Sequence, residues 1–130
     1  MTHLEHAKAL RNDPQGRHYN CAQSVLIPFA QELGLTEEQA YQLGSCFGSG
    51  MLHGATCGAL SAALMVAGMK GCDTQQATAL IHQFREDRQA TDCAALLAQA
   101  REGNIPKKDH CDGLVLDMVA KLDELLADRS

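Results

Sequence analysis

The sequence has few of the residues from which β-sheets and nucleic-acid interfaces are built. Its 130 residues include three Phe, two Tyr and no Trp, with only four Val and three Ile. Because β-branched and aromatic residues favour strands, their scarcity predicts an all-α fold. The net charge of −5, with no basic block longer than Lys107-Lys108, argues against a nucleic-acid surface.

Other absences limit the class of protein further. No apolar stretch reaches the roughly 20 residues that a membrane-spanning helix needs, so we expect no membrane insertion. The N-terminal MTHLEHAKAL has no basic flank followed by an apolar run, which predicts a cytoplasmic protein without a signal peptide. No CxxC pair occurs, which excludes the thioredoxin motif and the usual zinc-knuckle pairs. The length predicts one domain over residues 1–130.

The stretch from Gly44 to Gly71 organises the expected fold. Its first half is rich in glycine, and its second half, about 55–69, is small and apolar on nearly every face. A helix that is apolar all round is a buried helix. We therefore predict a compact bundle of five to seven helices around this central helix, with Thr56 as its N-cap and Gly71 as its C′ glycine.

Capping residues, turns and amphipathic periodicity predict the remaining helices. We expect a first helix over about 4–11 and a second from Asn20 to Gly34 that Pro28 kinks. A third helix opens with the capping box Thr36–Gln39 and turns Leu43 inward. A fifth helix is capped by Asp73 or Thr74, and a last helix is capped by Asp109. At Thr91-Asp92 the pattern restarts, either as a new helix or as a bend. His3 and His6 are interpreted as solvated surface.

Four of the six cysteines share one predicted local position. Cys21, Cys57, Cys93 and Cys111 each follow a capping residue and should lie in the first turn of a helix. Free N–H groups and the helix dipole favour a thiolate there, above all for Cys57 at the start of the central helix. If the four helix starts converge, they would stabilise either a cluster held by four thiolates or a reactive thiol pair.

A free cysteine is often only a small buried hydrophobe, and this is the better interpretation of any one of the four alone. Four cysteines at matching positions make it the weaker explanation. Cys46 and Cys72 lack the pattern and are expected to be spectators, although Cys46 would be a resolving thiol in disulfide exchange. His53 and His110 each lie near one of the four cysteines and are candidate ligands or proton donors, although a surface histidine is the commoner case.

The same residues resemble a family of putative redox-active proteins named for a C…CGAxxG…C…C pattern. The resemblance runs from Asn20-Cys21-Ala22-Gln23-Ser24-Val25, through Phe47-Gly48-Ser49-Gly50-Met51 and Cys57-Gly58-Ala59, to Cys93 and Cys111. The last glycine of the family motif is Ala62 here, which still allows close helix packing. The resemblance implies a small helical protein with redox-active cysteines, and a similar domain in some multi-centre cytochromes is associated with an iron–sulfur cluster.

The leading hypothesis is that Cys21, Cys57, Cys93 and Cys111 bind an iron–sulfur cluster, with the two-iron type favoured, for electron transfer or redox sensing with a redox partner protein. One alternative is a metal-free thiol–disulfide protein in which Cys57 is the low-pKa catalytic thiol. Another is a zinc-stapled module for protein contacts. The sequence does not decide among them, nor whether the protein is an enzyme or a homodimer.

Overall fold

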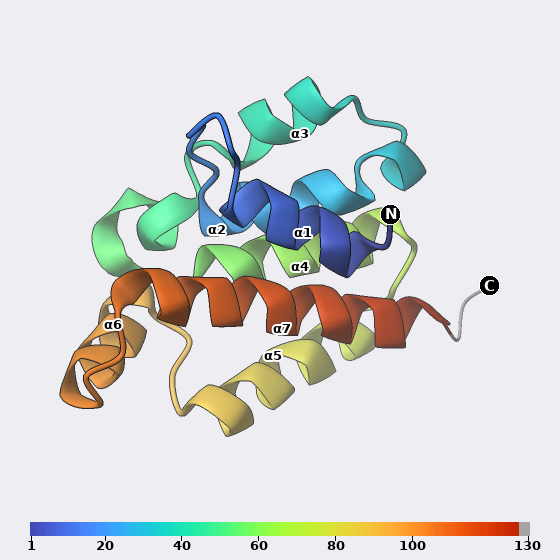
Figure 1. Ribbon diagram of the computed structural model, residues 1–130. Helices are drawn as coiled ribbons and strands as arrows, with labels where there is room; N and C mark the ends of the chain where they lie inside the picture. The colour runs from blue at the N-terminus through green and yellow to red at the C-terminus, as the bar shows by residue number, and fades with distance from the viewer. Residues whose placement is uncertain (128–130) are drawn as a thin grey trace.

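The computed structural model describes residues 1–127, which fold into a compact set of helices (Figure 1). The α-helices are α1 (His3–Arg11), α2 (Cys21–Leu26), α3 (Glu37–Gly44), α4 (Gly58–Met69), α5 (Thr74–Arg88), α6 (Cys93–Glu102) and α7 (Lys107–Ala127). Two 3₁₀ turns, η1 (Ile27–Phe29) and η2 (Gln31–Leu33), follow α2, and a π-helical turn, η3 (Gly50–Gly54), precedes α4. Within residues 1–127 the only β-type pairing is an isolated bridge between Thr56 and Asp92. The predicted all-α fold is confirmed.

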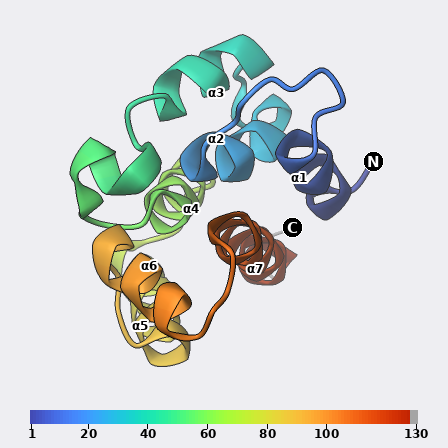
Figure 2. The ribbon, with the colours of Figure 1, turned by 60° about the vertical axis from the view of Figure 1, so that its left-hand side comes forward.

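Helices α2, α4 and α7 form the centre of the molecule. The most extensive helix–helix packing is that of α4 on α2, and α7 contacts both of them together with α1. Figure 2 views α7 nearly end on and shows α1, α2 and α4 around one side of it, with α5 and α6 on the α4 side, away from α1. None of the described helices is both long enough and apolar enough to cross a membrane.

The predicted central helix is α4, in which seven of the ten residues from 58 to 67 are buried and the other three are half-buried. Its last turn, with Gly68 and Met69, reaches the surface. It ends in a Schellman motif, in which the Cys72 N–H donates to the Ala67 carbonyl at 2.9 Å and Gly71 has a φ of +85°. The prediction that Gly71 closes this helix as its C′ glycine is confirmed.

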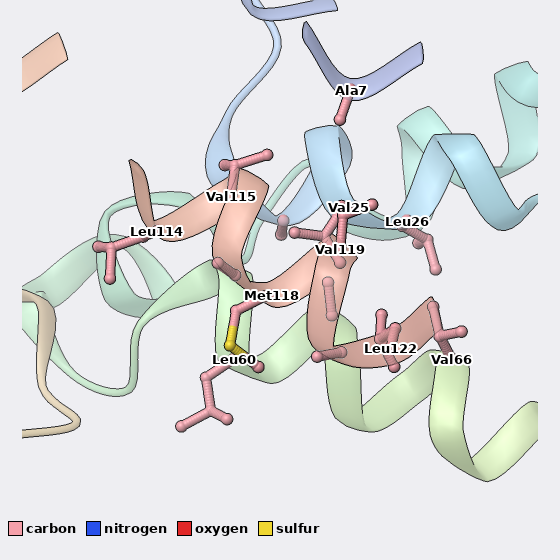
Figure 3. Close-up of a cluster of buried hydrophobic side chains, with 14 of the residues drawn as sticks. Ala7, Val25, Leu26, Leu60, Val66, Leu114, Val115, Met118, Val119 and Leu122 are labelled. Carbon is pink, nitrogen blue, oxygen red and sulfur yellow. The ribbon is translucent and has the colours of Figure 1, made fainter. Parts of the chain in front are cut away.

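The core lies where α7 crosses α2 and α4. Figure 3 shows Met118 of α7 beside Leu60 of α4, and Val119 of α7 close to Val25 of α2. These four side chains are at most 1% exposed. Burial of each such side chain contributes roughly 1.5–3 kcal/mol relative to exposure, so this crossing holds α2, α4 and α7 in fixed relative positions.

Side-chain caps fix where the surface helices begin. The Thr36 hydroxyl accepts the Gln39 N–H at 3.0 Å, and the Gln39 side chain accepts the Thr36 N–H at 2.9 Å. Asp73 and Gln76 form the same reciprocal pair at the start of α5. The capping box predicted for the third helix is confirmed, and Asp73 rather than Thr74 is the cap of α5.

The segment after α2 differs from the single kinked helix that the sequence predicts. α2 ends at Leu26, and Pro28 lies in the 3₁₀ turn η1. Proline has no N–H for the α-helical hydrogen bond and crowds the preceding turn, so it ends the helix here instead of bending it. Leu43, predicted to face the core, is 48% exposed, and Tyr41 of the same helix packs against the core in its place.

α5 and α6 are two separate helices, so the restart of the sequence pattern at Thr91-Asp92 marks a new helix and not a bend. Gln89 adopts a left-handed conformation, with a φ of +67°, and ends α5. The charged end of α5 is tied to α7 through Asp87 with Lys121 and through Arg88 with Asp117, the latter pair at 3.4 Å. These ion pairs fix α5 to the outer side of α7.

His3 is half-buried, which contradicts its interpretation as solvated surface. Its ring stacks on Phe29 with the ring centroids 3.9 Å apart. Its two ring nitrogens contact the carboxylates of Glu32 and Asp123. The imidazole therefore joins the start of α1 to η2 and to the last turns of α7, a contact between distant segments that sequence periodicity does not reveal.

Candidate cysteine site

α2 carries Cys21 at its first position. The Asn20 side chain accepts the Gln23 N–H at 2.8 Å, and the Gln23 side chain accepts the Asn20 N–H at 2.8 Å. The amide nitrogens of the same two side chains donate to carbonyls of α3, that of Asn20 to Gly44 at 3.1 Å and that of Gln23 to Tyr41 at 2.9 Å. The prediction that Asn20 caps a helix with Cys21 in its first turn is confirmed, and these bonds fix the start of α2 against α3.

The segments that contain Cys57 and Cys93 are joined through their backbones. The Cys57 N–H donates to the Thr91 carbonyl at 2.8 Å, and the Cys93 N–H donates to the Ala55 carbonyl at 2.7 Å. These two hydrogen bonds make up the isolated bridge between the segment before α4 and the segment before α6. The bridge places the starts of α4 and α6 next to each other, and each cysteine directly follows a residue of the bridge.

Both cysteines differ in detail from their predicted positions. Cys57 is itself the N-cap of α4, with φ −50° and ψ 130°, so it does not lie inside the helix behind a Thr56 cap. Cys93 is the first residue of α6, as predicted, but the Asp92 side chain makes no capping hydrogen bond. Both helix starts therefore lack a side-chain cap, and the bridge holds the backbone directly before them.

Cys111 does not lie in the first turn of a helix, contrary to the prediction. α7 begins at Lys107, directly after Pro106, and Asp109 lies inside its first turn instead of capping it. The Pro106 carbonyl accepts the His110 N–H at 3.0 Å, which starts the helical hydrogen bonding earlier than the Asp-based prediction allows. Cys111 is therefore the fifth residue of α7, and its side chain reaches the site from the second turn.

Glycines allow these segments to approach each other closely. Gly50 has a φ of +62°, and a Cβ at this position would lie 2.7 Å from the Cβ of Cys93. A Cβ on Gly58 would lie 2.6 Å from the Phe47 carbonyl oxygen and 3.3 Å from the Ala22 backbone nitrogen. Real Cβ atoms do not make contacts as short as 2.7 Å. The glycine-rich stretch is thus the packing surface between η3, α2, α4 and α6.

The four cysteine side chains form one group. The Cys21 thiol is hydrogen-bonded to Cys111. Cys57 interacts electrostatically with Cys21, Cys93 and Cys111, and Cys93 interacts with Cys111. In Figure 1 the starts of α2, α4, α6 and α7 all lie toward the left of the molecule, with the glycine-rich segment beside them. Four segments far apart in the sequence thus bring their sulfurs to one end of the bundle.

The hydrogen bond between Cys21 and Cys111 makes the two thiols unequal. Donation from Cys21, aided by the positive charges of Arg11 and Lys107 and opposed by burial, lowers the pKa of Cys111 to about 6. The same hydrogen bond, together with burial, raises the pKa of Cys21 well above its usual value. The pair therefore favours the thiolate on Cys111 and the protonated form on Cys21.

Cys57 is not the low-pKa thiol that its helix position predicts. It is only 3% exposed, and burial raises its pKa. The backbone N–H groups of Ala59 and Leu60 lower the pKa, but by less than burial raises it. Burial also raises the pKa of Cys93. Desolvation of the charged form outweighs the N–H groups of the helix start at Cys57, because this thiol lies inside the hydrophobic core.

Arg11 and Lys107 affect the site although sequence analysis did not select them. The Arg11 Nε donates to Asp112 at 2.7 Å, and its Nη1 donates to the Tyr19 carbonyl at 2.8 Å. These two hydrogen bonds hold the guanidinium between α1 and α7. Lys107 precedes Cys111 by four residues, a spacing that places both on one helix face and offered a signal in the sequence. Arg11 belongs to a distant helix, and only the folded chain brings it near Cys111.

The remaining candidates lie outside the cysteine group. Cys72 follows the far end of α4, roughly 18 Å from Cys57 at 1.5 Å of rise per residue. Cys46 is exposed and its sulfur lies 3.8 Å from the Ser45 hydroxyl. His53 is exposed, and its Nδ1 lies 2.8 Å from the Met51 carbonyl oxygen. The Nε2 of His110 is buried, and it has no hydrogen-bond partner among the residues that the structure describes.

Four thiol sulfurs are the donor set that iron–sulfur clusters and zinc prefer over hard cations. A single tetrahedral zinc ion needs its four sulfurs about 3.8 Å from one another, given Zn–S bonds of about 2.3 Å. Across residues 1–127, no three His, Cys, Asp or Glu side chains are grouped so that they could hold one metal ion without rearrangement. A two-iron cluster places iron and sulfide between its ligands, and this cysteine group matches it in number and type of ligand.

A family model described as "Putative redox-active protein (C_GCAxxG_C_C)" matches residues 19–125. The matched region contains all four cysteines of the group. The pattern in the family name places a glycine before the cysteine, whereas this chain reads Cys57-Gly58-Ala59. Searches of curated proteins and of solved structures gave no match.

Proposed function

This chain belongs to the C_GCAxxG_C_C family of putative redox-active proteins, and on that premise we propose that it binds an iron–sulfur cluster through Cys21, Cys57, Cys93 and Cys111. A two-iron cluster is the favoured type, and when bound it would supply one-electron transfer or redox sensing. The observation that carries the proposal is the convergence of four thiols from four separate segments at one end of the bundle.

The surroundings of the group support a ligand of net negative charge. The starts of α4 and α6 bring backbone N–H groups to the site, and the Ala59 and Leu60 N–H groups act on the Cys57 sulfur. Arg11 and Lys107 add positive charge on the α7 side. Because a four-thiolate cluster carries net negative charge, such groups stabilise it and tune its reduction potential.

Burial suits the same role. Cys57 lies in the hydrophobic core, whereas Cys93 and Cys111 are half-buried toward the surface. A cluster held there would be shielded from water on one side and accessible to electron transfer on the other. We therefore propose a redox partner protein that docks at the end of the bundle formed by the starts of α6 and α7.

The hydrogen-bonded pair of Cys21 and Cys111 favours a second candidate function, thiol–disulfide exchange without metal. In this reaction the Cys111 thiolate would attack a disulfide of the substrate, forming a mixed disulfide and releasing one substrate thiolate. Cys21, once deprotonated, would then attack the Cys111 sulfur and release the second substrate thiolate. The protein dithiol is oxidised to a disulfide and the substrate disulfide is reduced to two thiols, so electrons and atoms balance.

Anaerobic purification followed by visible spectroscopy and by iron, sulfide and zinc analysis tests the leading proposal. Charge-transfer bands with stoichiometric iron and sulfide are expected. A colourless protein with one zinc per chain would indicate the zinc-stapled module, which a chelator should then unfold. A colourless and metal-free protein that reconstitution does not restore would contradict the cluster, and formation of a reducible disulfide between Cys21 and Cys111 would support the exchange reaction.

A further inference from the structure

A cavity of about 270 Å³ lies next to the cysteine group, between the end of α1, the loop that follows it and the start of α7. Cys111 is one of the residues that line it. Five of the eight residues around it are basic and none is acidic: Arg11, Arg17, His18, Lys107 and Lys108. The cavity concentrates basic groups in a chain whose net charge is −5.

Several of these basic groups have hydrogen-bonding capacity to spare. The side chains of Lys107 and His18 make no hydrogen bond or ion pair with any other residue in the range 1–127. Arg11 is 11% exposed and uses two of the five N–H donors of a guanidinium, on Asp112 and on the Tyr19 carbonyl. The remaining donors of a mostly buried guanidinium are suited to a bidentate carboxylate or phosphate.

The acidic groups nearby do not neutralise the cavity. Asp112 is shared by Arg11 at 2.7 Å and Lys108 at 2.8 Å, so one carboxylate faces two cations. Glu38 lies 3.6 Å from Arg17 and is 62% exposed, where solvent screening weakens the pair. Lys107 adds a further positive charge with no acidic partner in the part of the chain that the structure describes.

We infer that this cavity is a binding site for a small anion, carrying a carboxylate or a phosphate, held against the sulfur of Cys111. Its volume of about 270 Å³ suits a small organic acid or a phosphate ester. The basic residues are not among the four cysteines, so this inference does not rest on the presence of a cluster. It adds a ligand site at the edge of the redox site through which a small charged molecule reaches Cys111.

Calorimetric titration of the 130-residue protein with citrate and with inorganic phosphate tests the site. Tyrosine fluorescence serves as a local reporter, because Tyr19 lines the cavity, Tyr41 packs against Tyr19, and the chain has no other Tyr and no Trp. We expect saturable binding of at least one anion, with a fluorescence change. Binding of citrate alone identifies a carboxylate site, and binding of phosphate alone identifies a phosphate site.

The matched variants are the double substitution His18→Gln with Lys107→Gln and the control Lys8→Gln. The double variant should bind the anion roughly tenfold more weakly, since about 1.4 kcal/mol of charge interaction corresponds to one decade. Lys8 is exposed on α1 and does not line the cavity, so its loss should leave the affinity within about twofold. Failure of both anions to bind, or equal binding by wild type and the double variant, would overturn the site.

A second measurement tests whether the cavity reaches the sulfur. Iodoacetate and iodoacetamide differ in charge but little in size, so the ratio of their alkylation rates at one cysteine reports local charge independently of thiolate fraction. On reduced, metal-free protein this ratio should be several-fold higher at Cys111 than at exposed Cys46, and Lys107→Gln should lower it at Cys111 alone. Equal ratios at the two cysteines, or alkylation of Cys46 without any at Cys111, would contradict the inference.

Discussion

Replacing Gly58 by alanine should destabilise the protein although it improves helix propensity. A Cβ at this position would lie 2.6 Å from the Phe47 carbonyl oxygen and 3.3 Å from the Ala22 nitrogen. Both are backbone atoms, so neither can move aside without shifting the start of α2 or the turn before η3. Overpacking of this kind typically costs about 1–3 kcal/mol, which exceeds the fraction of a kcal/mol gained from replacing glycine in the first helical turn.

Gly68 provides the matched control on the same helix. It is exposed, and a Cβ placed there meets no atom within 4 Å. Gly68→Ala should therefore stabilise the protein by about 0.5–1 kcal/mol through helix propensity alone. Because both substitutions gain helix propensity, the two Gly→Ala variants on α4 should differ by about 1–3 kcal/mol in the free energy of unfolding.

Urea unfolding of the metal-free protein, followed by far-ultraviolet circular dichroism, measures this difference directly. The change should appear in the transition midpoint with an unchanged slope. Gly58→Ala should also lower the capacity of the protein to retain iron, because it displaces Cys57 from Cys21. A Gly58→Ala protein as stable as the Gly68→Ala protein would refute the conclusion that this glycine permits the close contact of α4 with α2.

Three further predictions concern thiol chemistry, backbone strain and charge. The iodoacetamide alkylation rate of Cys111, followed by mass spectrometry, should reach half its maximum near pH 6, and Cys21→Ala should shift that midpoint upward; a wild-type midpoint near 8.5 would contradict the hydrogen-bonded pair. Leu52 is 67% exposed with a φ of +68°, so Leu52→Gly should raise the free energy of unfolding by about 1 kcal/mol in urea titrations, and an unchanged value would argue against strain there. Burial raises the pKa of Asp112, but hydrogen bonds from Lys108 and Arg11 lower it by more, so the pKa in the folded protein is below its usual value. The ionised carboxylate therefore stabilises the folded protein at pH 7, and this contribution is lost as the pH falls below about 4. Asp112→Asn should therefore be less stable than wild type at pH 7 and nearly equal to it at pH 2, and an equal deficit at both pH values would contradict this linkage.

Local signals in the sequence were sufficient to predict most of the helices. Asn20 and Thr36 cap helices because their side chains bond to N–H groups within three residues, which is information contained in a short segment. Gly71 ends α4 for an equally local reason, since the left-handed conformation favours glycine. Such features do not depend on which distant segment the helix packs against.

The predictions that were wrong depended on tertiary contacts or on competing local signals. Cys57 stands at a helix start, but the core around it determines its pKa. Leu43 lies at an apolar position of its helix, yet no neighbouring element covers it. For Cys111, the helix starts at Lys107 after a proline, so Asp109 was the wrong capping residue. The backbone bridge of Thr56 with Asp92, directly before Cys57 and Cys93, joins segments distant in sequence, and no local pattern indicates it.

The proposal that four cysteines share one cluster is tested most directly by six single Cys→Ser variants, purified anaerobically and analysed for iron, sulfide and visible absorption. Loss of cluster absorption and of most of the iron is expected for Cys21, Cys57, Cys93 and Cys111. The Cys46 and Cys72 variants should retain both at the wild-type level, because their sulfurs lie outside the group. Retention of the full iron content by any of the first four variants, or its loss from the Cys46 and Cys72 variants, would contradict the proposed set of ligands.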